Sequence, residues 1–137
     1  MEHYITLKNN VNEISPLTLA FVGDGVYDLM VREYLVSLGN RPVGELNKMK
    51  VSLVNCASQS RFSKMILPHF NEKETAVFKR GRNAAPKCTP KNGSVADYHA
   101  ATGLECLCGY LYLDGQDKRL KEIFSLILHM TFASEGD

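Results

Sequence analysis

The amino-acid sequence predicts a compact all-α domain built as a helical bundle. Apolar residues recur at helical spacing in several segments, and proline, glycine or capping side chains separate these segments. No stretch alternates apolar and polar residues between hairpin turns, so strands are not expected. The chain has 137 residues, of which 45% are hydrophobic and 23% charged. This composition is typical of one folded domain and not of a disordered chain.

Two helical regions are expected in the first half of the chain. The Ser-Pro pair at positions 15–16 is a typical helix start, because serine caps and proline fits the first helical position. Apolar residues then recur over residues 17–38, and Gly39 is suited to end that helix. A second helical region covers residues 43–67 and ends at Pro68, because proline cannot continue a helix.

Three further helices are expected in the second half. Asn71, with a glutamate three residues later, resembles a capping box and begins a helix over residues 72–82. Ser94 caps a helix over residues 95–113. The last helix covers residues 117–132.

The charge of the chain is unevenly distributed, although the net charge is only +1. Residues 41–91 hold 11 Lys/Arg and 3 Asp/Glu, whereas the rest holds 5 and 12. A loop expected over residues 84–93 extends a basic segment, residues 79–93, which contains no acidic residue. Such a footprint suits a polyanion. No apolar run is long enough to span a membrane and the N-terminus lacks a signal-peptide pattern, so we expect a cytoplasmic protein.

Two of the expected helices carry a carboxylate where helix rules do not favour one. Asp24 lies between Gly23 and Gly25 with apolar neighbours on its own face, and each mid-helix glycine costs about 1 kcal/mol relative to alanine. Glu105 is the only acidic residue of residues 100–113, which also contain two glycines. Because a buried carboxylate without a partner is costly, this pattern predicts either structural pairing or a functional site.

The two carboxylates allow two chemistries if they converge. With waters they suit Mg²⁺, which prefers oxygen ligands. A carboxylate pair also serves acid–base hydrolysis of glycosides. The basic segment favours a phosphodiester substrate over a neutral sugar. From pattern alone, the structural alternative stays open, namely that each carboxylate caps a helix or pairs with a buried arginine.

Three blocks of the sequence, in this order, resemble the ribonuclease III family. Residues 21–26 read FVGDGV and are similar to that family's signature F-L-G-D-[AS]-V. Residues 44–55, GELNKMKVSLVN, are similar to the helix that follows the signature. Residues 105–114, ECLCGYLYLD, are similar to the second acidic block E-A-L-I-G-A-I-Y-L-D. The resemblance covers about residues 15–130 and includes both unusual carboxylates.

Two more segments are similar to the Mini-III branch of this family: KRGRNA at residues 79–84 and TPKN at residues 89–92. That branch is a catalytic domain alone. The resemblance therefore implies a single ribonuclease III-like catalytic domain over residues 1–137, with its core at about residues 15–132 and no separate RNA-binding domain.

The resemblance implies a Mg²⁺-dependent endoribonuclease that cleaves double-stranded RNA and leaves 5′-phosphate ends. Asp24 and Glu105 are the expected catalytic and metal-supporting residues. Two further acidic positions of full ribonuclease III hold Ala20 and Thr102 here, as in the Mini-III branch. Thr102 is a candidate to hold a metal-bound water, and His99 is expected at the surface rather than at the site. The expected RNA contacts are basic and amide side chains of the basic segment: Lys79, Arg80, Arg82, Asn83, Lys87, Lys91 and Asn92.

The family implies a homodimer with two catalytic centres, and Phe21 is a candidate interface residue with a core role as the alternative. The branch implies that the substrate is the precursor of 23S ribosomal RNA, with a ribosomal protein as a candidate partner. Two other functions remain open. One is a ribonuclease III-like module that binds RNA without cutting it. The other is a helical DNA-binding regulator, which is disfavoured because the basic cluster lies largely in a loop.

Overall fold

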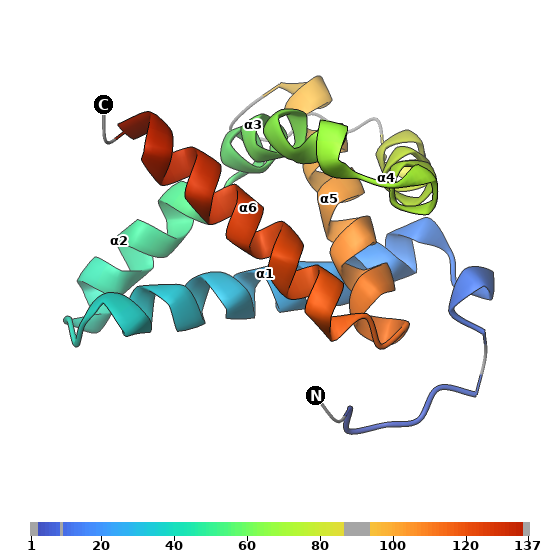
Figure 1. Ribbon diagram of the computed structural model, residues 1–137, viewed down its shortest axis with the longest axis horizontal. Helices are drawn as coiled ribbons and strands as arrows, with labels where there is room; N and C mark the ends of the chain where they lie inside the picture. Colours follow the sequence, from blue (N-terminus) through green and yellow to red (C-terminus); the bar gives the residue numbers. More distant parts are fainter. Residues whose placement is uncertain (1–2, 9, 87–93, 136–137) are drawn as a thin grey trace.

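The computed structural model describes residues 3–8, 10–86 and 94–135, with side chains up to residue 131. All regular structure in these residues is helical, which confirms the all-α prediction (Figure 1). In chain order the elements are η1 (Val11–Glu13), α1 (Pro16–Leu38), α2 (Val43–Val54), α3 (Cys56–Ile66), η2 (Leu67–His69), α4 (Glu72–Ala84), α5 (Val95–Leu113) and α6 (Asp117–Glu135).

Helix α5 is the centre of the fold. It packs against α1, α3, α4 and α6, and Figure 1 shows it crossing α1 at a steep angle, with α6 running diagonally past both. Residues 101–104 and 106–111 of α5 are all buried. Glu105 interrupts this run and is only partly buried. The most apolar helix of the chain therefore presents a single carboxylate from its buried middle.

The crossing of α1 and α5 depends on two glycines. A Cβ atom at Gly23 would overlap the backbone carbonyl oxygen of Glu105, and one at Gly109 would overlap that of Leu19. Neither position can carry a side chain without separating the helices, so the two backbones are in direct contact. Gly25 differs, because a Cβ there would meet only open space. The helix-breaking glycine before Asp24 is thus explained by packing.

Most of the helix boundaries follow the sequence signals. The capping box at α4 is complete: the Glu74 backbone N–H donates to Asn71 Oδ1 at 2.8 Å, and the Asn71 N–H donates to Glu74 Oε1 at 2.9 Å. At α5 the Asp97 N–H donates to Ser94 Oγ at 3.0 Å. Ser15 differs from expectation, because its hydroxyl donates to the Thr18 side chain and does not cap a backbone N–H.

The prediction of one continuous helix over residues 43–67 is wrong. Helix α2 ends at Val54, and Asn55 adopts an extended conformation with φ −68° and ψ 160°. The Asn55 side chain accepts a hydrogen bond from the Ser58 N–H at 2.8 Å, so it caps a new helix, α3. Helix α3 ends at Ile66, within one residue of the predicted end, and Pro68 lies in η2. The break turns α3 onto α5, beside Glu105.

A buried ion pair joins α4 to α6. Glu74 is 1% exposed, and Arg119 Nε and Nη2 donate to its two carboxylate oxygens at 2.7 and 2.9 Å. Arg119 Nη2 also donates to the His69 carbonyl at 2.8 Å. Burial alone would raise the Glu74 pKa, but the hydrogen bonds from Arg119 and Asn71 and the Arg119 charge outweigh it and lower the pKa. This carboxylate is fully satisfied.

Candidate active site

Asp24 and Glu105 converge where α1 and α5 are in backbone contact. Gly23, directly before Asp24, touches the backbone of Glu105 itself, so the closest approach of the helices falls between the two acidic residues. Asp24 contributes to the raised pKa of Glu105 through hydrogen bonding and charge, so the two carboxyl groups are neighbours. In the part of the chain that is described, neither carboxylate forms an ion pair with lysine or arginine. The structural alternative of a buried arginine partner is therefore wrong.

The two carboxylates differ in exposure. Asp24 is exposed, whereas Glu105 is mostly buried. The expectation that Asp24 is buried among apolar neighbours on its own helix face is wrong. Of those neighbours, Ala20 and Tyr27 are buried, but Phe21 turns to solvent and leaves Asp24 at the rim of the crossing. The pair thus has one partly buried member and one member that water and solutes reach.

The surroundings of Glu105 favour its protonated form. Burial, together with the hydrogen bond and the charge of Asp24, raises the pKa of Glu105 to about 8, while a hydrogen bond with Gln59 acts in the opposite direction. Without a cation, Glu105 therefore keeps its proton at neutral pH more readily than an ordinary glutamate does. A cation placed between the two carboxyl groups would take over the role of that proton.

Two residues that the sequence did not single out border the pair, both from α3. Gln59 is 3% exposed; its Nε2 donates to the Val54 carbonyl at 2.8 Å and its Oε1 has no hydrogen-bond partner among the described residues. Burial and then the charge of Glu105 raise the pKa of the Cys56 thiol, which places Cys56 near the pair as well. The only sequence signal was the run of three polar residues at positions 58–60, one of which had to face the core.

The two polar residues considered on α5 do not join the pair. Thr102 is buried, and its hydroxyl donates to the Tyr98 carbonyl one turn earlier at 3.0 Å, so its proton is held by its own helix. His99 Nε2 lies 3.2 Å from the Pro86 carbonyl oxygen, at the start of the helix. The suggestion that Thr102 holds a metal-bound water stays a prediction.

The expected RNA-contacting residues that the structure describes lie at the end of α4. Lys79, Arg80 and Asn83 are exposed there, and the Arg82 guanidinium lies 5.9 Å from the centroid of the Phe78 ring. Their exposure is compatible with contacts to an extended polyanion. The other three predicted RNA contacts, Lys87, Lys91 and Asn92, lie outside the described residues.

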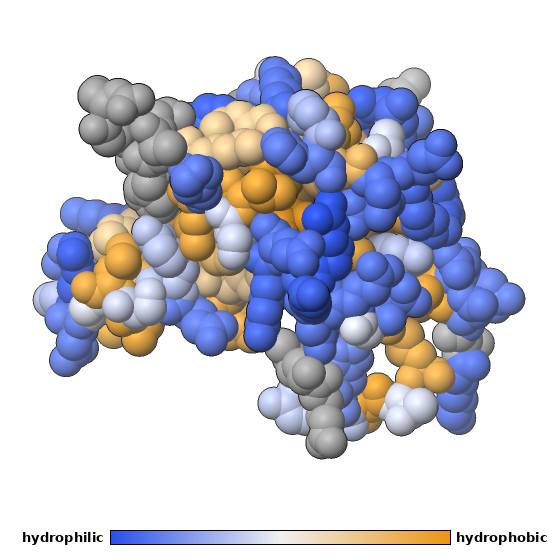
Figure 2. All heavy atoms as spheres, in the orientation of Figure 1, coloured by the Kyte–Doolittle hydropathy of each residue, from blue (hydrophilic) through white to orange (hydrophobic). Residues whose placement is uncertain are grey.

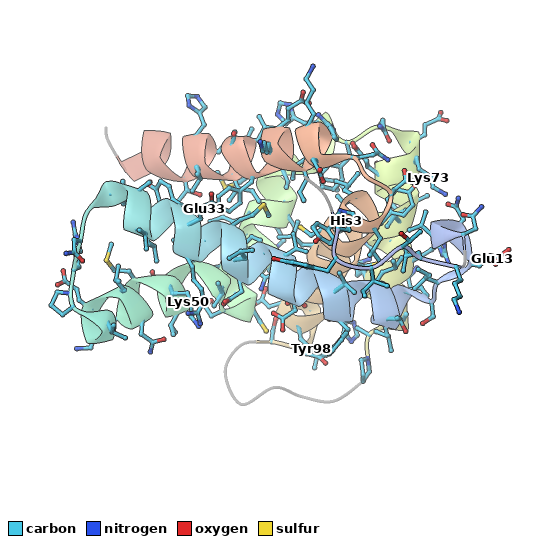
Figure 3. The ribbon with its side chains drawn as sticks, turned by 90° about the horizontal axis from the view of Figure 1, so that it is seen from below. His3, Glu13, Glu33, Lys50, Lys73 and Tyr98 are labelled. Carbon is cyan, nitrogen blue, oxygen red and sulfur yellow. The ribbon has the colours of Figure 1, made fainter. Side chains whose placement is uncertain are left out.

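Phe21 is 81% exposed, so a core role for it is wrong. Leu17 and Leu29 are exposed on the same helix, and at its far end Val36 and Leu38 adjoin exposed Val43, where Figure 2 shows hydrophobic surface. Beside this face, a groove of about 670 Å³ lies between α1 and α6. Its lining includes Val26, Met30, Phe124 and also Glu33, which Figure 3 shows between these two helices. Large apolar side chains exposed along one helix are typical of an interaction face.

The chain is similar to known proteins over most of its length. Residues 17–116 match the ribonuclease III domain family. Mini-ribonuclease 3 of Clostridium tetani is 40% identical over 124 residues, which cover 90% of this chain and 82% of that protein. Mini-ribonuclease 3 of a Thermoanaerobacter species is 44% identical over 119 residues, which cover 87% and 84%.

The fold also agrees with an experimental structure. A crystal structure of a protein from Fusobacterium nucleatum superposes with a TM-score of 0.79 at 31% identity, covering 87% of this chain and 98% of that chain. In the residues described here, no helix could cross a membrane. The matched region contains the whole α1–α5 crossing, and ribonuclease III enzymes act on RNA and generally use divalent metal ions. The chain therefore belongs to the ribonuclease III family and is an endoribonuclease.

Proposed function

We propose that the protein cleaves double-stranded RNA with the help of Mg²⁺, and that Asp24 and Glu105 are its catalytic, metal-supporting residues. The observation that carries the proposal is the convergence of these two carboxylates at a helix crossing that only glycine permits. A structural carboxylate needs no such arrangement, as the Glu74–Arg119 pair demonstrates within the same chain.

The donor set of the site fits Mg²⁺. Both acidic side chains offer oxygen, and the neighbouring Gln59 offers an amide oxygen that has no partner among the described residues. The described residues contain no group of three or more His, Cys, Asp or Glu suited to a metal. Two carboxylates supplemented by water are typical of Mg²⁺, which keeps part of its hydration shell, and are unlike the sulfur and nitrogen sets of zinc.

The side chains then have distinct tasks in hydrolysis. A bound Mg²⁺ supplies a water of lowered pKa and neutralises charge on the phosphate. Glu105, whose pKa is raised to about 8, would be deprotonated when it holds the cation, and its proton would pass to solvent. Asp24, exposed at the rim, provides a second carboxylate where the phosphodiester has access. The products carry 5′-phosphate ends.

The basic segment, residues 79–93, is our candidate for binding the RNA. Lys79, Arg80 and Arg82 on α4 are our candidates for contacts to phosphates, and Asn83 for a 2′-hydroxyl, together with Lys87, Lys91 and Asn92. Base edges in the deep major groove of A-form RNA are out of reach, so recognition is by backbone and shape. Affinity of this kind falls steeply with salt concentration.

We further propose a homodimer formed through the exposed apolar face of α1, with Phe21 as its anchor. Phe21 is a large side chain left 81% exposed beside a glycine, Gly25, that leaves open space. A two-fold axis would pair this face with itself and set two sites in a fixed relation, as cutting both strands requires. Phe21→Glu should shift the sedimentation of the protein to that of a monomer.

For the natural substrate we propose the precursor of 23S ribosomal RNA, in the cytoplasm, with a ribosomal protein as a candidate partner. Similarity to proteins named Mini-ribonuclease 3 supports this assignment. Reverse-transcription mapping of precursor ends in cells with and without the protein tests it, and unchanged 23S ends would contradict it.

The central test is gel cleavage of a long double-stranded RNA at low salt. The native protein with Mg²⁺ should cut the duplex and leave the single-stranded form of the same RNA intact, and EDTA should stop the reaction. Asp24→Asn should remove cleavage. Asp28→Asn is the matched control, because Asp28 lies one turn further along α1 and pairs with Arg32 and Lys50. RNA binding without cleavage by any of the three proteins would instead favour a non-catalytic RNA-binding module.

A further inference from the structure

The Gln59 side chain leaves one of its polar groups unused next to the acidic pair. A glutamine amide has two N–H donors and one oxygen acceptor. One donor is taken by the Val54 carbonyl at 2.8 Å, and the amide is close enough to Glu105 to lower the pKa of that carboxyl group. The oxygen, Oε1, is buried and has no partner among the described residues. Since Oε1 and Nε2 belong to one planar group, this acceptor is held beside Glu105.

Such an arrangement is costly for a purely structural glutamine. Leaving a buried acceptor without a hydrogen bond costs about 1–3 kcal/mol. The neighbouring buried hydroxyls of α3 avoid that cost: Ser58 donates to the Ser52 carbonyl and Ser63 to the Gln59 carbonyl, both at 2.7 Å. An acceptor that stays unpaired in otherwise satisfied surroundings indicates a ligand that supplies the donor.

The surroundings limit what that donor can be. Glu105, the carboxyl group whose pKa Gln59 influences, becomes a pure acceptor once it is ionised. The hydration waters of a divalent cation are the opposite, because their lone pairs face the cation and both hydrogens point outward. Mg²⁺ retains several such waters when only one or two carboxylates bind it.

We propose that Gln59 is a positioning residue of the cation site: its Oε1 accepts a hydrogen bond from a hydration water of the divalent cation held by Asp24 and Glu105. The inference rests on the proposed function, because it requires that cation. Gln59 would be an uncharged residue that contacts the hydration water and not the cation itself. It belongs to α3, whereas Asp24 and Glu105 belong to α1 and α5. Outer partners of this kind orient metal ligands, and their loss typically lowers metal affinity by about 10–100-fold.

Two other roles for Gln59 make different predictions. The first is a structural role, in which the hydrogen bond to the Val54 carbonyl links α3 to the end of α2. The second is a contact to a ribose hydroxyl of the substrate. Loss of a structural hydrogen bond would change only the stability of the fold. Loss of a ribose contact would change RNA affinity without changing the affinity of the free protein for a cation.

The experiment measures Mn²⁺ affinity of the full-length, RNA-free protein by electron paramagnetic resonance, for the native chain, Gln59→Met and Gln59→Glu. Gln59→Met keeps the volume but removes the acceptor, and we expect an affinity about tenfold weaker. Gln59→Glu keeps an acceptor oxygen but loses the donor to Val54, and we expect an affinity no weaker than that of the native chain. Ser58→Ala is the matched control, because it removes the neighbouring tie between α3 and α2, to Ser52, and should leave Mn²⁺ affinity unchanged.

Duplex RNA affinity in EDTA is measured in parallel and should be equal in all four proteins. The proposal is overturned if Gln59→Met binds Mn²⁺ as the native chain does, if Ser58→Ala loses affinity equally, or if only RNA affinity changes. Should Gln59→Met not fold, Gln59→Asn withdraws the amide by one methylene and must show the same loss of Mn²⁺ affinity. Native protein that binds no Mn²⁺ would overturn the proposed cation site and this inference with it, which separates the two failures.

Discussion

Two glutamates in this chain, one buried and one partly buried, have opposite surroundings. Glu74 on α4 meets the guanidinium of Arg119 and the capping N–H of Asn71, and its pKa is lowered. Glu105 on α5 meets another carboxyl group, that of Asp24, and its pKa is raised to about 8. The first is satisfied by the protein itself. The second lacks a positive partner within the described residues.

This difference in surroundings distinguishes a structural carboxylate from a functional one. Both glutamates are at least partly buried, so burial alone decides nothing. What differs is whether the fold supplies the compensating charge. Where it does, the group contributes to stability. Where it does not, the fold keeps a destabilised group, which is a candidate functional residue.

The sharpest test of this contrast replaces each glutamate by glutamine. Glu105→Gln should reduce duplex cleavage on the order of 10²–10⁴-fold, because metal-assisted stabilisation of several kcal/mol is lost. Glu74→Gln should cleave at nearly the native rate at a temperature where it stays folded. Single-turnover cleavage with Mg²⁺ measures both, and equal losses would mean that the two carboxylates are not distinct in role.

The next largest effect concerns Arg119, the positively charged partner of Glu74. Arg119→Met leaves Glu74 buried without its partner, and we expect the free energy of unfolding to fall by about 3 kcal/mol. Arg119 is 27% exposed, which keeps the loss at the low end for a buried pair. Urea unfolding followed by circular dichroism measures it. A loss below 1 kcal/mol would place this pair with ordinary surface salt bridges.

The two glutamates should also give opposite pH dependence of stability in EDTA. The Glu105 pKa is raised in the folded protein from its ordinary value of 4.5 to about 8, so the folded state holds a proton that the unfolded state releases, and stability falls by about 5 kcal/mol as pH rises across this range. The Glu74 pKa is lowered, so its contribution is present above its unfolded pKa and disappears in acid. Urea unfolding of native protein and Glu105→Gln at pH 5 and pH 8 should show the alkaline loss only in the native chain.

The smallest expected effect separates the glycines on either side of Asp24. Gly25→Ala should raise the free energy of unfolding by up to about 1 kcal/mol, because a Cβ there meets nothing and alanine favours helix. Gly23→Ala should instead destabilise the fold strongly, because its Cβ would overlap the Glu105 carbonyl. Thermal unfolding of both variants checks the sign at each position.

The sequence predicted local features better than distant pairings. The caps at Asn71 and Ser94 predicted the starts of α4 and α5, because a capping side chain acts within one turn. Asn55 was missed because an asparagine inside an apolar helical pattern signals a break only weakly, and with it the direction of α3 was missed. The exposure of Asp24 follows from which residues of α1 lie under α5, and only the assembled fold determines this.

The same limit applies to the candidate site. Asp24 and Glu105 were predicted because they break helix rules within their own segments. Gln59 breaks no rule locally, and only the packing of α3 on α5 gives its unpaired oxygen a meaning. The prediction that Asp24 and Glu105 hold a cation, and that the basic segment contacts RNA, remains to be tested by the experiments above.

The backbone contact at Gly23 has a consequence for how the protein can change. Because main-chain atoms set the spacing of α1 and α5, the reach between the two acidic side chains is fixed before any rotamer is chosen. A lineage could exchange the carboxylates, the basic residues or the apolar face one at a time. It could not add a single methyl group at position 23 without resetting the span available to an ion. The spacing of the two acidic side chains is therefore fixed by the lack of a side chain at position 23.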